Sequence, residues 1–211
     1  MSAARVPALI DSALQAQHVE ESDATAKNQS LQELIDHPSD EVFEAARRLI
    51  ESSVPGERKL GVRILRELGR PQMPYAGAAV GELSRLLERE RQPDLLVWTV
   101  SALGNQHVGE ALPVLWELAT YPEPAVRDSV SGAISGAAMS TGLDDRSIDV
   151  LCRLSQDTDA DVRFSAIFEL SAWRAHGVND PRITAALEQA RHDNDPRVAR
   201  AAMNARGGGT A

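Results

Sequence analysis

Residues 159–166, Asp-Ala-Asp-Val-Arg-Phe-Ser-Ala, hold a pattern that returns along most of this 211-residue chain. An acidic or proline residue comes first, an apolar anchor such as Val162 follows, and small or apolar residues lie four and eight positions after the anchor. This spacing is the period of an amphipathic helix, and acids and prolines are typical of helix starts. The stretch therefore predicts a helix that begins near Asp159.

Four further copies of the pattern predict an array of repeated helices. Taken as equivalent, the five anchors are separated by 35, 31, 36 and 36 residues. An apolar stripe of helical period precedes each anchor, so each repeat holds two helices. A near-constant period of this length is typical of helical solenoids. The anchors are Leu60, Leu95, Val126, Val162 and Val198.

The predicted fold is therefore all-α: a right-handed α-α superhelix of about five helix pairs with an N-terminal capping helix. We expect capping helices and a polar linker in residues 1–37 and the repeat array in residues 38–206. Residues 207–211, Gly-Gly-Gly-Thr-Ala, are expected to form a flexible tail.

The openings of the repeats and the Leu-Gly pairs at residues 68–69 and 103–104 resemble those of HEAT-repeat proteins. Among these, the chain is most similar to the bacterial phycobilisome-lyase HEAT-like repeats. The resemblance covers roughly residues 38–206, and it departs from the pattern at Arg206, where a closing leucine is usual. It implies that the second helix of each pair lines a concave surface where partners bind, while it describes packing rather than function.

Composition and charge exclude several classes of protein. The chain is 43% hydrophobic but only 4% aromatic, which favours a core of small and aliphatic side chains between helices. A net charge of −9 argues against a general binder of nucleic acid or anionic membranes. No apolar run is long enough for a membrane span, and residues 1–17 lack the features of a signal peptide. We therefore expect a soluble, cytoplasmic monomer.

The candidate partner-binding residues follow from helical geometry. With an anchor at position 0, positions −1, 3, 6 and 10 point away from the core, because successive residues turn by about 100°. In the repeats these positions hold a basic stripe, a tryptophan, small residues and a phenylalanine. The candidates are Lys59, Arg63, Arg66, Arg70, Trp98, Ser101, Asn105, Ser129, Gly132 and Phe168.

Each of these features has two interpretations. The basic stripe is either a solvated helix face with local ion pairs or an anchor for an acidic peptide or phosphate. Trp98 and Phe168 are either exposed anchors for a partner or core residues, because a shift of one residue in the register would bury them. Trp116 and Trp173 are expected in the core.

The arginines that directly follow two anchors, Arg127 and Arg163, are assigned a structural role. The resemblance implies that each reaches an aspartate of the neighbouring repeat and so forms a ladder along the array. The acidic residues near at hand are Asp128, Asp159 and Asp161.

The sequence holds no recognisable catalytic or metal-binding motif. The single cysteine, Cys152, excludes disulfides within the chain and cysteine-based zinc clusters. Residues 157–168 begin like a calcium loop, but Val162 and Phe168 stand where glycine and glutamate are required. None of the five histidines pairs with another at a spacing of four. We predict no catalytic residue, metal or cofactor.

The leading hypothesis is a non-enzymatic scaffold that binds a protein or peptide, acidic in character, on its concave face. The alternative is an enzyme, because some bacterial HEAT-like proteins are alkylpurine DNA glycosylases and the family name includes a lyase. Those glycosylases use aromatic residues and an aspartate between basic flanks, which Trp98, Asp94, Asp128 and the basic stripe could imitate. No local motif carries over their catalytic residues, and the acidic net charge weighs against DNA.

Overall fold

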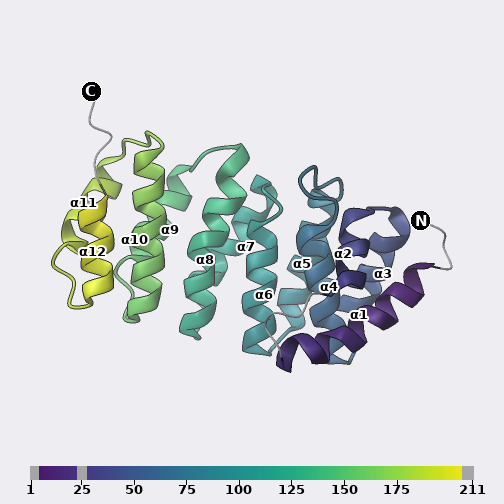
Figure 1. The fold of residues 1–211 in the computed structure, drawn as a ribbon. Coiled ribbons are helices and arrows are strands. Elements are labelled where there is room, and N and C mark those ends of the chain that lie inside the picture. The colour runs from purple at the N-terminus through teal and green to yellow at the C-terminus, as the bar shows by residue number, and fades with distance from the viewer. Residues whose placement is uncertain (1–4, 23–27, 206–211) are drawn as a thin grey trace. The chain divides into compact units, whose positions relative to one another are not determined.

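The computed structural model describes residues 5–22 and 28–205, except for the side chains of residues 18–22. All regular secondary structure in these residues is helical (Figure 1). The predicted all-α class is therefore confirmed. None of the described helices is long and apolar enough to cross a membrane. The predicted tail, residues 207–211, lies outside the described residues.

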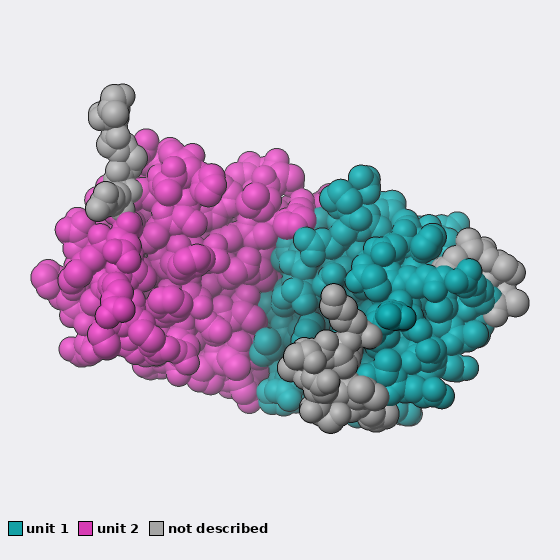
Figure 2. Space-filling model, in the orientation of Figure 1, with its two compact units in different colours: residues 1–106 teal, residues 107–211 magenta. Residues whose placement is uncertain are grey.

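The chain consists of two compact units, residues 1–106 and 107–211 (Figure 2). Unit 1 holds α1 (Arg5–Ser22), α2 (Gln29–Asp36), α3 (Asp40–Ile50), α4 (Pro55–Glu67), α5 (Ala76–Arg89) and α6 (Pro93–Gly104). Unit 2 holds η1 (Gly109–Ala111), α7 (Leu112–Leu118), α8 (Pro124–Ala137), η2 (Ala138–Ser140), α9 (Asp145–Leu154), α10 (Ala160–Ala175), α11 (Pro181–Ala190) and α12 (Pro196–Asn204).

The repeat is a pair of helices, and the second helix of each pair begins at a recognisable signal. Proline occupies the first turn of α4, α6, α8 and α12, where its missing N–H costs no hydrogen bond. In α10 the side chain of Asp159 caps the helix instead, accepting hydrogen bonds from the backbone N–H groups of Asp161 and Val162. Five such pairs run from α3 to α12, as the sequence pattern predicted.

The paired helices of unit 2 form two layers. In one layer α10 packs against both α8 and α12, and in the other α9 packs against both α7 and α11 (Figure 1). The anchors Val126, Val162 and Val198 are fully buried between the layers. The opposite face of α8, α10 and α12 is the inner face on which the sequence places Ser129, Gly132 and Phe168.

The first repeat departs from the predicted register by almost one helical turn. Leu60 is buried, but it stands five residues after the proline that begins α4, whereas Val126 stands two residues after the proline that begins α8. The residue of α4 at the equivalent place is Glu57, which is half-exposed. Counting from Pro55 rather than from the first apolar residue gives the correct equivalence.

The N-terminal helix covers the start of the array. Helix α1 packs against α2, α3 and α4, so it belongs to the end cap of unit 1 (Figure 1). The side chain of Asn28 joins the two cap helices: its Nδ2 donates to the carbonyl of Ala13 at 2.9 Å, and its Oδ1 accepts from the N–H of Leu31. The cap is thus held by a buried polar side chain as well as by apolar contacts.

Candidate functional site

An exposed aromatic side chain, that of Phe168, lies on the inner face of unit 2. This side chain is 57% exposed, and its ring stacks on that of Phe164 with centroids 6.4 Å apart. Exposing a large aromatic ring to water is unfavourable, so such a residue is a candidate contact for a partner. The structure thus resolves the two interpretations of Phe168 in favour of exposure.

A pocket of about 610 Å³ opens beside this ring between α10 and α12. We call it the Phe168 pocket. Aromatic rings and small side chains form one part of its wall, and two arginines and an asparagine form the other. Five of its lining residues stand at positions that helical geometry assigned to the inner face. The lining residues are Phe164, Phe168, Ser171, Ala172, Ala175, Arg197, Arg200, Ala201, Asn204 and Ala205.

The two arginines of the Phe168 pocket differ in their partners. Arg197 is held by Asp161 at 2.7 Å and by Asp195 at 2.9 Å. Arg200 is exposed and makes no hydrogen bond or ion pair within the described residues. Its guanidinium can therefore donate hydrogen bonds to a carboxylate or phosphate of a partner without first losing a bond within the protein.

Small residues lie along the neighbouring seam between α8 and α10. The Ser129 hydroxyl donates to the carbonyl of Val126 at 2.7 Å, so it is turned back onto its own helix. Gly132 is exposed, and a Cβ atom built on it would lie 3.7 Å from Oε1 of Glu169. Trp173 is half-buried rather than fully in the core, and its Nε1 donates to the hydroxyl of the buried Ser135 at 3.0 Å. Trp116 is likewise half-buried and donates to Ser147.

Two carboxylic acids with raised pKa values, Asp128 and Glu169, lie in this seam. Burial raises the pKa of Asp128, and the Ser165 hydroxyl, which lowers the pKa through a hydrogen bond, does not cancel the effect. Burial also raises the pKa of Glu169 against a hydrogen bond from Ser135. Oδ1 of Asp128 is buried without a hydrogen-bond partner. Both acids therefore hold their protons to a higher pH than exposed carboxyls do.

The candidates in unit 1 are already engaged by their own surroundings. The Arg66 guanidinium lies 5.4 Å from the centre of the Trp98 ring, a cation–π contact, so this tryptophan is half-buried beneath it. Arg66 and Arg70 also approach Glu67 at 3.9 and 4.0 Å. Lys59 and Arg63 have interaction partners as well. Ser101 and Asn105 are half-buried on α6 and just after it.

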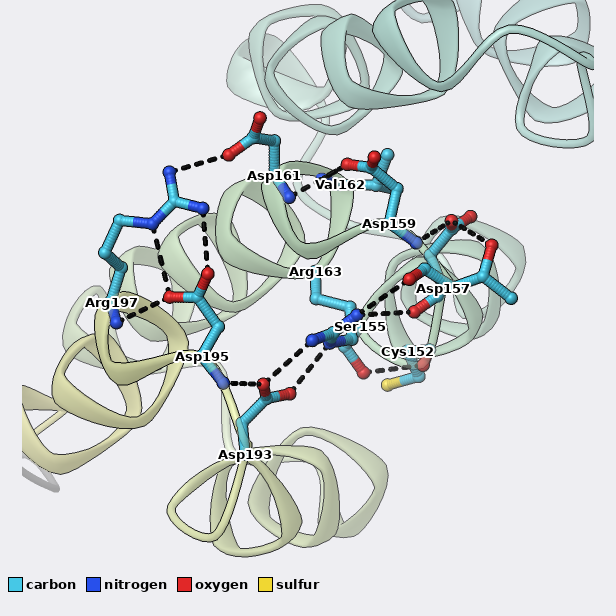
Figure 3. Close-up of polar contacts among 11 residues, drawn as sticks. Cys152, Ser155, Asp157, Asp159, Asp161, Val162, Arg163, Asp193, Asp195 and Arg197 are labelled. Carbon is cyan, nitrogen blue, oxygen red and sulfur yellow. Dashed lines mark hydrogen bonds and ion pairs between the residues drawn. The ribbon is translucent and has the colours of Figure 1, made fainter.

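The arginine ladder exists, but its predicted acidic partners are wrong. Arg127 forms a two-point ion pair with Asp157 at 2.7 and 2.8 Å. Arg163 forms the same kind of pair with Asp193 at 2.8 and 2.9 Å, and Figure 3 shows this second pair. Asp128 lies in the seam, Asp159 caps α10, and Asp161 reaches Arg197. The arginine lowers the pKa of its carboxylate in both pairs.

Each ladder arginine also closes the loop that precedes its own helix. The Nη1 group of Arg163 donates to the carbonyls five and six residues earlier, those of Thr158 and Asp157. Arg127 binds the carbonyls of Pro122 and Tyr121 in the same way. A third example in unit 1, which the shifted register concealed, is Arg58 with Glu90, Ser52 and Ser53. The structural role assigned to these arginines is therefore consistent with every bond they make.

The chemistry of the described residues offers no catalytic constellation. Cys152 is half-buried, and burial raises the pKa of its thiol to about 11, so the thiolate that a nucleophile requires is scarce at neutral pH. Among the described residues there is no group of three histidine, cysteine, aspartate or glutamate side chains that could hold a metal ion.

Comparison with known proteins agrees with this architecture. Residues 80–171 match the family described as HEAT repeats. None of the curated proteins matches the sequence. A subfamily among the HEAT-like proteins is not indicated by this match, so the similarity to phycobilisome-lyase repeats stays a prediction.

Solved structures with the same fold include both designed and natural helical repeats. An engineered protein has a TM-score of 0.64 at 19% identity, over 97% of this chain and 95% of that chain. A designed armadillo repeat protein in complex with the peptide (KR)4 has a TM-score of 0.61 at 15% identity, over 95% and 97%. The YibA protein of E. coli has a TM-score of 0.60 at 14% identity, over 90% and 73%. At these identities the likeness concerns the fold alone.

Proposed function

Because residues 80–171 match the HEAT-repeat family, we propose that this chain binds a protein or peptide partner without catalysing a reaction, and that the partner docks in the Phe168 pocket. HEAT and armadillo-like repeats commonly mediate protein binding, and one of the similar structures is a designed protein holding a peptide. The observation that carries the proposal is the exposed Phe168 ring on a pocket of about 610 Å³.

The lining of the pocket indicates which partner fits. Phe164 and Phe168 offer apolar contact area, while Arg200 offers an uncommitted positive charge close by. A segment with an aromatic or aliphatic side chain next to an aspartate, glutamate or C-terminal carboxylate would satisfy both. Aromatic residues and arginines are also the residue types that most often dominate binding energy at interfaces.

A selection from a random peptide library tests this proposal directly. Peptides of about twelve residues selected on the full chain should be enriched in acidic residues beside an apolar one, and calorimetry should then measure their affinity. The variant Phe168→Ala/Arg200→Glu removes the ring and reverses the charge, and we expect its affinity to fall at least about tenfold, or ~1.4 kcal/mol.

A control variant changes an exposed apolar residue and an exposed arginine that lie away from the pocket. Met139 and Arg153 are exposed in unit 2 and do not line the Phe168 pocket. Met139→Ala/Arg153→Glu should leave the affinity within about twofold, since scattered surface contacts contribute little. If the selected peptides bind the Phe168→Ala/Arg200→Glu variant as well as the original chain, with both variants equally helical by circular dichroism, the pocket is not the docking site.

A further inference from the structure

A second groove, at the opposite end of the sequence, lies between the N-terminal cap and the first repeat. It has a volume of about 640 Å³ and separates α1 from α3 within unit 1. Its apolar surface comes from Val6, Pro7 and Ile10 of α1 and from Ala45 and Leu49 of α3. Pro7 is exposed and Ile10 is half-buried, whereas Val6, Ala45 and Leu49 are buried, so the open apolar surface of the groove comes mainly from α1.

The rim of the groove is acidic. Asp11, Glu41 and Glu57 line it, and none of their carboxylates makes a hydrogen bond or ion pair within the described residues. Two further acids of the lining are engaged nearby: Asp40 accepts from the Tyr75 hydroxyl, and Glu44 pairs with Arg47. Arg48 is the basic residue of the lining. The groove therefore places an excess of negative charge around an apolar floor.

Glu57 shows that this rim is a departure from the repeat rather than part of it. In the other repeats the equivalent position, two residues into the helix, holds an apolar residue that is buried against its neighbours. In α4 the position is a half-exposed glutamate that faces the groove. A carboxylate here forgoes the apolar burial that stabilises the other repeats. The equivalent apolar residues are Leu95, Val126, Val162 and Val198.

We propose that this groove docks a basic amphipathic helix of a partner protein. The aliphatic side chains of that helix lie on the apolar surface of Pro7 and Ile10, and its lysines or arginines face Asp11, Glu41 and Glu57. Charge complementarity selects this occupant, because an acidic peptide or a phosphate would meet an excess of like charge at the rim. The surface is separate in sequence and chemistry from the Phe168 pocket, so the inference goes beyond the proposed function.

The experiment uses a probe of defined chemistry on the full chain. The probe is a fluorescein-labelled 14-residue helix of leucine and lysine with leucines on one face, and its control carries glutamate in place of every lysine. Fluorescence anisotropy at about 50 mM salt should show binding of the lysine probe alone, and the affinity should fall as salt rises, because exposed charges are screened.

Two double variants of equal net charge locate the binding. Glu41→Gln/Glu57→Gln removes two uncommitted rim charges, whereas Glu88→Gln/Glu110→Gln removes two exposed glutamates away from the groove. We expect the first to weaken binding of the lysine probe at least about fivefold and the second less than about twofold. The Phe168→Ala/Arg200→Glu variant should leave this affinity unchanged, which keeps the test distinct from that of the proposed function.

Several results would overturn the proposal. Equal weakening by the two glutamine variants would mean that the acidic chain attracts the probe without a specific site. Equal binding of the glutamate probe would remove charge as the basis of selection. A loss caused by Phe168→Ala/Arg200→Glu would place the probe in the other pocket. Dimerisation of the chain without probe, abolished by Glu41→Gln/Glu57→Gln in sedimentation experiments, would make a second copy the occupant instead.

Discussion

Replacing Arg163 by methionine tests the ladder, since methionine retains an unbranched apolar stem and removes the charged guanidinium. The guanidinium makes four bonds: two to the Asp193 carboxylate at 2.8 and 2.9 Å, and two to backbone carbonyls at 3.0 and 3.2 Å. The arginine and aspartate side chains are only 17% and 12% exposed. The change therefore leaves a mostly buried carboxylate without its cation.

The magnitude lies between two known limits. An exposed ion pair contributes about 0–1 kcal/mol, and removing one partner of a fully buried pair costs about 3–5 kcal/mol. With most of both side chains buried, we expect Arg163→Met to lower the free energy of unfolding by about 2–3 kcal/mol. For a chain of this size that corresponds to a fall in Tm of roughly 5–10 °C.

Urea unfolding, followed by circular dichroism and by tryptophan fluorescence, measures this loss. Arg197→Met is the matched control, because Arg197 also pairs with two aspartates but its side chain is 56% exposed. The control should lose far less stability. Adding Asp193→Asn to Arg163→Met should cost less than the sum of the single changes, with a coupling of about 1–2 kcal/mol. Equal losses in Arg163→Met and Arg197→Met, or no coupling, would refute the ladder as a stabilising device.

Two further changes probe packing and ionisation. Gly61→Ala should destabilise by about 1–3 kcal/mol in the same assay, since the new Cβ would lie 2.7 Å from Cγ2 of Ile50 and 2.9 Å from backbone atoms of α3; Gly77→Ala, which meets nothing within 4 Å, should be neutral or stabilising. Glu169→Gln should become more stable relative to the original chain as pH rises from about 4 to 7. The pKa of Glu169 is raised in the folded state, so its contribution to the stability of the original chain is complete below its unfolded pKa and is lost as pH rises through the folded pKa. A stability difference that does not change with pH would contradict this account.

The sequence pattern predicted the fold well because its anchors report burial directly. Val126, Val162 and Val198 follow their helix starts at one fixed distance, and all three are fully buried. In the first repeat the predicted anchor was wrong, because Glu57 interrupts the apolar series and Leu60 was taken as the anchor in its place. A helix start signal, the proline at position 55, carried the correct register.

The candidate site was less predictable, because contacts depend on loop geometry that periodicity does not describe. Asp157, Asp159 and Asp161 lie within five residues, yet one binds a ladder arginine, one caps a helix and one reaches the next repeat. Phe168 could be placed on the inner face but not shown to be exposed. The pocket beside it also needs Phe164 and Arg200, which stand at positions that a single helical wheel assigns elsewhere.

The ladder arginines make the same bonds at the same sequence spacing in neighbouring repeats. Arg127 and Arg163 are each the fourth residue of their helix, each binds the carbonyls five and six residues before it, and each meets an aspartate thirty residues after it. Excising residues 128–163 would join Arg127 to Phe164 in helical register and leave Arg127 facing Asp193. A chain built in this way can lose or gain one whole repeat and keep an arginine–aspartate pair between each of these neighbours, so its length can change in steps of one repeat.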